Sequence, residues 1–158
     1  IGIADIYIAL CETIERAIAA AGIEAPVIAS DLSEPIVRPS IKIELSDDIS
    51  ARDTTHMDAR SLTARIYYFA PDAHQWRAAH YAMQDALRGA LHDSLMVGAF
   101  EIYSEDGIDF DQTDGVLIGT IQYEWLEERP SHDDGELMEE LSVAINTRQE
   151  GMNYGIYP

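Results

Sequence analysis

The apolar residues at the start of the chain recur at the spacing of an amphipathic helix. From Ile3 to Ala21 they occupy positions 3, 6, 7, 10, 14, 17, 18 and 21, which form one stripe along an α-helix. Gly22 follows at the position where glycine commonly ends a helix. We predict a helix over residues 3–21, followed by a short strand around Val27 and Ile28.

Period-two alternation predicts two longer strands in the middle of the chain. In residues 38–45 (RPSIKIEL) the three apolar side chains that follow the serine share one face. Residues 61–71 (SLTARIYYFAP) alternate in the same way. The stretch between them, residues 46–60, is polar and has no period. We therefore predict an antiparallel pair of strands joined by a long, mobile loop.

The second predicted helix runs from residues 72–73 to about Ser94. Its apolar stripe consists of Trp76, His80, Met83, Leu87 and Leu91. Two more strands are predicted over residues 96–107 and 115–128. The turn-rich residues 106–115 connect them in the manner of a hairpin.

Both faces of the last predicted strand are partly apolar. Val116 and Ile118 alternate with Leu117 and Ile121, so apolar side chains point both ways from the strand. A strand of this kind needs cover on both sides. We predict that helices cover one face and that a neighbouring subunit covers the other.

The pattern divides the chain into a domain over residues 1–128 and a C-terminal extension over residues 129–158. Within the extension a polar linker precedes residues 136–146, whose apolar positions predict a short helix. The predicted order is α-β-β-β-α-β-β followed by a helical tail, which defines an α+β fold class.

The charge balance narrows the classes of function. The chain has 29 acidic and 10 basic residues, a formal charge of −19, and Lys42 is its single lysine. Such a surface repels phosphates and anionic membranes, which argues against sequence-specific DNA binding. Two explanations of the acidity stay open, namely adaptation to high salt and a channel wall past which DNA slides without sticking.

Catalytic and metal-binding motifs are missing from the sequence. It has no nucleotide-binding glycine motif, no GxSxG and no HExxH. Asp109 and Asp111 have the first spacing of a calcium loop, but Asp114 occupies the glycine position and Thr120 the closing acidic position. A solvated turn is the better interpretation there, and we predict neither a metal nor another cofactor.

The histidines and the single cysteine give no catalytic arrangement either. His74, His80 and His92 are spread along the second predicted helix and do not converge on one ion. His80 lies on the apolar stripe and is predicted to be a core or interface histidine. Cys11 falls among the buried positions of the first helix and is predicted to be a structural thiol rather than a nucleophile.

Arginines are scarce and therefore informative. Arg38, Arg60 and Arg65 flank or lie within the two central strands. Because guanidinium groups pair with carboxylates in bidentate fashion, each is a candidate clamp on an acidic neighbouring subunit. A local cross-strand salt bridge is the alternative. With Tyr123 and Trp125 of the last strand, these arginines form our predicted subunit interface.

The order of these elements resembles the tail terminator proteins of tailed phages and related viruses. The resemblance rests on ADIYIAL in the first helix, RPSIKIEL, the arginine-bearing strand leading to YYFAP, and the helix after it. It spans roughly residues 3–126, and the order and spacing of the motifs carry it. It implies a mixed or antiparallel β-sheet flanked by two main helices.

The resemblance also implies a function in the virion. Members form a homo-oligomeric ring, typically a hexamer, at the head-proximal end of the tail, and are assembled in the host cytoplasm. The implied partners are other copies of the chain, the tail tube protein and the head-completion or neck proteins, with DNA passing through unbound. The family supplies no catalytic residues and no cofactor.

Two other classes of function stay open from the residues alone. One is a small acidic binding protein that mimics DNA. The other is an enzyme dependent on a divalent cation, with an active site built from carboxylates. A stable monomer would favour the first, and a metal-dependent thermal shift the second.

Overall fold

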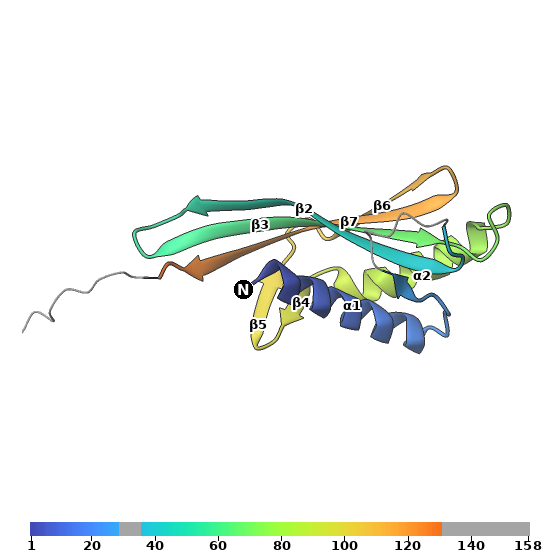
Figure 1. Ribbon diagram of the computed structural model, residues 1–158, viewed down its shortest axis with the longest axis horizontal. Coiled ribbons are helices and arrows are strands. Elements are labelled where there is room, and N and C mark those ends of the chain that lie inside the picture. The colour runs from blue at the N-terminus through green and yellow to red at the C-terminus, as the bar shows by residue number, and fades with distance from the viewer. Residues whose placement is uncertain (29–35, 131–158) are drawn as a thin grey trace, which may run out of the picture.

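The computed structural model describes residues 1–28 and 36–130. Within them, two helices pack against one face of a single mixed sheet (Figure 1). The helices are α1 (Ile3–Ala20) and α2 (Arg77–Leu91). The strands are β1 (Val27–Ile28), β2 (Ser40–Arg52), β3 (Met57–Phe69), β4 (Ser94–Val97), β5 (Phe100–Tyr103), β6 (Ile108–Thr113) and β7 (Val116–Glu128).

The sheet has the strand order β1-β2-β3-β7-β5-β4, and β6 also pairs with β7. The pairing of β1 with β2 is parallel and all the others are antiparallel, so the mixed alternative of the predicted fold class is the one observed. The predicted α+β class with two main helices is confirmed. The predicted C-terminal helical tail lies outside the described residues.

Helix α1 forms where its apolar stripe predicts it. Gly22 has a φ of +70°, and two backbone hydrogen bonds close the helix end, from Gly22 to Ala19 at 3.2 Å and from Ile23 to Ile18 at 2.9 Å. This is the Schellman arrangement, which glycine permits because it has no Cβ. The buried side chains of the helix are Ile6, Ala9, Leu10, Ile14 and Ile18.

Helix α2 is shorter than predicted. The carboxylate of Asp72 accepts backbone hydrogen bonds from His74 at 2.8 Å and Gln75 at 3.2 Å, and these bonds hold a turn instead of a first helical turn. The helix therefore begins at Arg77. It ends at Leu91 because Ser94 already belongs to β4.

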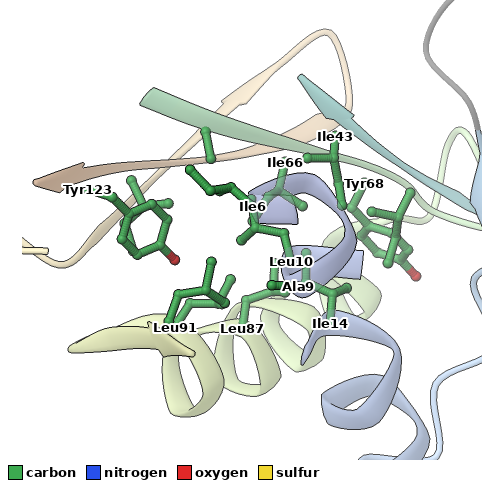
Figure 2. Packing of buried hydrophobic residues seen from close by; sticks show 14 of the residues in the cluster. Ile6, Ala9, Leu10, Ile14, Ile43, Ile66, Tyr68, Leu87, Leu91 and Tyr123 are labelled. Atoms are coloured by element: carbon green, nitrogen blue, oxygen red, sulfur yellow. The ribbon is translucent and has the colours of Figure 1, made fainter. Parts of the chain in front are cut away.

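The core lies between the two helices and the covered face of the sheet (Figure 2). Ile6 and Leu10 of α1 and Leu87 of α2 meet Ile66 and Tyr123 of the sheet, all of them at most 1% exposed. Full burial of a side chain of this size contributes about 1.5–3 kcal/mol. This packing fixes the helices on one face and leaves the opposite face of the sheet free.

The prediction of a mobile loop over residues 46–60 is wrong. Strand β2 continues to Arg52 and β3 starts at Met57, so only residues 53–56 connect them. A register shift between Ser46 and Ile49 bends β2. Beyond the shift, β2, β3 and β7 project past the helices, as Figure 1 shows. We call this projection, residues 49–61 and 122–128, the arm.

The polar sequence of the arm follows from its position. The backbone groups of its central strand are satisfied on both sides, since β3 pairs with β2 on one side and with β7 on the other. The end of β2 is exposed on both faces, so its side chains need no apolar alternation.

Two further predictions about strands are wrong. Residues 96–107 do not form one strand: a hairpin of β4 and β5 occupies residues 94–103, because Gly98, with a φ of +63°, reverses the chain. Residues 106–115 contain strand β6, which pairs with β7. The turn between β6 and β7 is made by Asp114 and Gly115, whose φ values of 53° and 73° match a type I′ hairpin turn. The described chain thus has seven strands instead of five.

Candidate subunit-contact surfaces

The sheet face opposite the helices, which we call the outer face, has no cover from the described residues (Figure 1). Register places Lys42, Tyr67, Ile118 and Asp111 in one row across β2, β3, β7 and β6. The neighbouring row consists of Glu44, Arg65, Thr120 and Asp109. The outer face therefore has a half-buried centre and charged residues toward both edges.

Cations gather on the β2 side of the outer face. Arg38 donates to the carbonyl of Ala70 at 3.1 Å, and its guanidinium lies 5.9 Å from the ring centre of Phe69. The Nζ of Lys42 lies 5.9 Å from the ring centre of Tyr67. Cation–π contacts of this kind hold the charges over the sheet.

Arg65 completes the basic side. It donates to the hydroxyl of Ser46 at 2.6 Å and lies 3.7 Å from the carboxylate of Asp47. Its side chain is 36% exposed and so stays available for a further partner. On the opposite side, β6 carries the exposed carboxylates of Asp109 and Asp111. We call the β2 side, where these three cations lie beside the carboxylates of Glu44 and Asp47, the basic side of the outer face, and the β6 side its acidic side.

The arm contains the second cluster, on the side of the sheet that faces the helices. Arg60 donates to Glu127 at 2.8 Å and to Asp48 at 3.0 Å. Its guanidinium lies 5.3 Å from the ring centre of Trp125, and the amino group of Ile1 also pairs with Glu127. For Arg60 the structure thus shows the local cross-strand salt bridge within one chain.

The charges of this cluster stabilise one another. Hydrogen bonding to the amino terminus, and then to Arg60, lowers the pKa of Glu127 below its ordinary value. Hydrogen bonding to Asp48 raises the pKa of Arg60. Among the described residues, the Nε atom of Arg60 and the indole nitrogen of Trp125 are buried without a hydrogen-bond partner.

The structure separates the five predicted interface residues. Arg38 and Arg65 lie on the outer face, and Arg60 and Trp125 lie together on the arm. Tyr123 is fully buried in the core, where burial raises the pKa of its hydroxyl. Sequence reasoning missed the acidic side of the outer face, because β6 was interpreted as a turn. The alternation of Ile108 and Phe110 with aspartates was the signal for it.

A groove of about 660 Å³ runs beside the arm, and we call it the arm groove. Four large apolar side chains line it and are about half exposed. They are Ile49 (56% exposed), Phe100 (47%), Tyr103 (57%) and Leu126 (50%). Ala51 and Ala59 extend the apolar wall, while Glu101 and Glu124 also line the groove. Side chains of this size are seldom exposed together without a partner.

His80 and Cys11 lie away from both surfaces. His80 is fully buried, with its ring 4.7 Å from that of Trp76 and 5.8 Å from that of Tyr68. Burial, and then the charge of Arg38, lowers its pKa. Cys11 is half-buried rather than buried, and burial raises the pKa of its thiol.

No group of three or more histidine, cysteine or acidic side chains that could hold a metal occurs among residues 1–28 and 36–130. Neither of the two described helices is long and apolar enough to cross a membrane.

An α+β subunit with an uncovered sheet face and a projecting arm fits a class of structural proteins that act by assembly. The family described as "Phage tail terminator protein" matches residues 9–135. The chain belongs to this phage tail terminator family, whose members are structural proteins of the virion tail.

The solved structures that are similar to the chain include the following two. One is a chain from the virion of a native gene transfer agent particle, 17% identical, with 76% of this chain and 95% of that chain covered and a TM-score of 0.39. The other is 14% identical, covers 84% of this chain and 99% of that chain, and has a TM-score of 0.42. The search of curated proteins finds no match.

Proposed function

We propose that the protein is a tail terminator subunit that forms a ring, caps the tail tube and ends its polymerisation. The family match over residues 9–135, which includes nearly the whole described fold, carries this proposal. In the assembled virion the ring lies at the head-proximal end of the tail. It joins the tail tube protein on one side to head-completion or neck proteins on the other.

The outer face supplies a contact suited to a ring. A ring forms when one surface of a subunit binds a different surface of the next and the rotation closes. The basic side of one copy, with Arg38 and Arg65, meets the acidic side of the next copy, with Asp109 and Asp111. Tyr67 lies between the two sides and supplies apolar contact.

The other predicted interface residues support this contact from within the subunit. Arg60 and Trp125 hold the three strands of the arm in register, and Tyr123 anchors β7 to the helices. These residues do not touch the neighbouring copy in this arrangement, but they keep the sheet in the shape that presents the outer face. The surplus of acidic residues keeps phosphates from binding, so DNA passes through the ring without being held.

Size-exclusion chromatography with light scattering tests the ring. Six copies of the 17.6 kDa chain would give a mass of about 106 kDa. We expect an oligomer near this mass both at about 0.1 M NaCl, where the Debye length is about 10 Å, and at about 2 M NaCl, where surface charges are almost fully screened. A monomer under both conditions, at high protein concentration, would refute the proposal.

A charge swap tests the contact itself. Arg65→Glu and Asp109→Arg should each shift the protein toward monomer, because each places like charges opposite one another. The double variant restores the attraction and should recover the oligomer. Arg16→Glu is the matched control, since it makes the same charge change at an exposed position on α1. If the control acts as strongly as Arg65→Glu, net charge explains the effect and the contact is wrong.

A further inference from the structure

The floor of the arm groove lies on the outer face of the sheet. Along β3, Ser61 and Ala59 alternate with Arg60 and therefore share the face of Arg65. Their register partners on β2 and β7 complete two rows of side chains. These partners are Ile49 and Glu124 for Ser61, and Ala51 and Leu126 for Ala59. Most of this floor is apolar and exposed, so its burial by a partner would be favourable.

The strand that borders the groove, β7, directs its backbone groups alternately to its two sides. The type I′ turn before β7 makes Thr113 and Val116 a hydrogen-bonded pair. The even-numbered residues of β7 therefore direct their N–H and C=O groups toward β6 and β5, and the odd-numbered residues direct theirs toward β3. The backbone hydrogen bond from Arg129 to His56, at 2.8 Å, has the same parity.

The end of β7 thus has an open backbone edge in the groove. In the described chain, β5 pairs with this edge at Tyr103 and Glu124 alone. Beyond that pair, β4 and β5 lie beside α1 rather than beside the arm (Figure 1). Leu126 and Glu128 are the next even-numbered residues, and no strand of the described chain pairs with them on this side. Their N–H and C=O groups are available to an added strand.

Carboxylates surround this open edge. Glu101 and Glu124 line the groove, and Glu128 shares the face of Glu124 on β7. Among the described residues, none of the three takes part in an ion pair. Hydrogen bonds from Ser94, and then from Tyr103, lower the pKa of Glu101, which keeps it ionised at neutral pH. A strand that carries cations is therefore the complementary partner.

The other open strands of the described sheet do not supply such a strand from a second copy. β6 carries Asp109 and Asp111. Residues 43–52 of β2 have three acidic residues and one basic residue, Arg52, and a register shift interrupts them. β1 and β4 are short and have no basic residue. Since like charges repel, the partner that fits is a different protein.

We propose that the arm groove binds an extended segment of a different protein, which adds a strand to the end of β7. The backbone of this segment pairs with Leu126 and Glu128, as in other cases of β-strand addition. An apolar residue of the segment lies opposite Leu126, and basic residues two positions away on either side face Glu124 and Glu128. The site is separate from the contact proposed for the ring and does not depend on it.

Fluorescence anisotropy with the full-length chain tests the site. The probe is a fluorescein-labelled peptide, Thr-Lys-Val-Leu-Val-Lys-Thr, whose symmetric pattern suits either strand direction. One control peptide has glutamate in place of lysine, and another has a methyl group on the backbone nitrogen of leucine. At about 0.1 M NaCl we expect saturable binding of the probe and at least about five-fold weaker binding of both controls. Absence of saturable binding, or equal affinity for the three peptides, would overturn the proposal.

A matched pair of variants locates the binding. Glu124→Lys should weaken binding of the probe by at least about five-fold, and Glu15→Lys, at an exposed position on α1, by less than about two-fold. Both variants change the net charge equally, so an equal loss would mean that the probe only follows the overall charge, and the proposed site would be wrong. Arg65→Glu protein should still bind the probe, so a failure of the ring and a failure of this site give different results.

Hydrogen exchange at single-residue resolution tests the added strand itself. Bound probe should slow exchange of the Leu126 and Glu128 amides several-fold. It should leave Trp125 and Glu127 unchanged, because their amides already point toward β3. An equal change at all four amides, or no change at any of them, would show that the peptide does not pair with β7 and would overturn the proposal.

Discussion

Replacement of His80 by phenylalanine should flatten the dependence of stability on pH. The imidazole is fully buried between Trp76 and Tyr68, and neither ring nitrogen has a hydrogen-bond partner among the described residues. A proton on this ring would create a buried cation near the positive charge of Arg38. The folded protein therefore holds His80 neutral. Phenylalanine keeps the ring contact with Trp76 and cannot be protonated.

The sign and size of the effect follow from proton linkage. The folded state has the lower pKa, so the unfolded state binds the proton first as the pH falls below about 6.5. The stability contributed by neutral His80 is complete above that pH and decreases as the pH falls toward the folded-state pKa. One proton changes the free energy of unfolding by at most about 1.4 kcal/mol per pH unit. Between roughly pH 7 and pH 5.5 the loss is up to about 1.2 kcal/mol.

Urea unfolding followed by far-ultraviolet circular dichroism measures this loss at both pH values. The wild-type protein should lose up to about 1.2 kcal/mol and His80→Phe much less, at the same protein concentration. His56→Gln is the matched control, because His56 is exposed in the turn between β2 and β3, and it should behave as the wild type does. If His80→Phe and the wild type lose the same amount, His80 is not held neutral in the fold and the reasoning fails.

Three further changes test the arm, the turns and the thiol. Arg60→Met removes two ion pairs and a cation–π contact, so it should lower the free energy of unfolding in urea by about 1–3 kcal/mol. Arg16→Met, at an exposed position on α1, should lower it by less than about 0.5 kcal/mol. Gly115→Ala should lower the melting temperature, because the added Cβ would lie 3.2 Å from the Trp76 indole and the backbone φ is +73°. Gly89→Ala in α2 is the control: its Cβ meets nothing within 4 Å, so this change should raise the melting temperature. The thiol of Cys11, whose pKa is raised, should react with iodoacetamide at about pH 8 several-fold more slowly in the folded protein than in the urea-unfolded chain. Equal rates in the two states would contradict its partial burial.

The sequence predicted the parts of the fold whose side chains meet the core. Helix α1 and the strand pair around Ile43 and Ile66 can be recognised in the sequence, because burial of one side gives their apolar residues a regular period. Strand β6 carries the same signal in Ile108 and Phe110, but acidic residues and glycines on both sides of it gave the whole segment the composition of a turn.

The pattern of apolar and polar residues could not predict the strands of the arm, and the reason is physical. Its strands are held mainly by backbone pairing, and backbone hydrogen bonds leave no trace in the pattern of side chains. The contacts of the candidate surfaces could not be predicted from the sequence either, because they depend on the same strand pairing. Arg60 and Asp48 are neighbours only because β2 and β3 pair beyond residue 46, and Arg60 reaches Glu127 only because β7 continues beside them.

The overall charge bears on where two copies can meet. A subunit with a formal charge of −19 repels another copy in most orientations, so the approach is least unfavourable where cations lie. Arg38, Lys42 and Arg65 bring three of the ten basic residues to one side of the outer face. Electrostatics of this kind selects the orientation more than it supplies affinity. In concentrated salt the Debye length shrinks to about 3 Å, and this selection weakens. A ring that is stable in molar salt would therefore depend on the apolar centre of the outer face, around Tyr67 and Ile118.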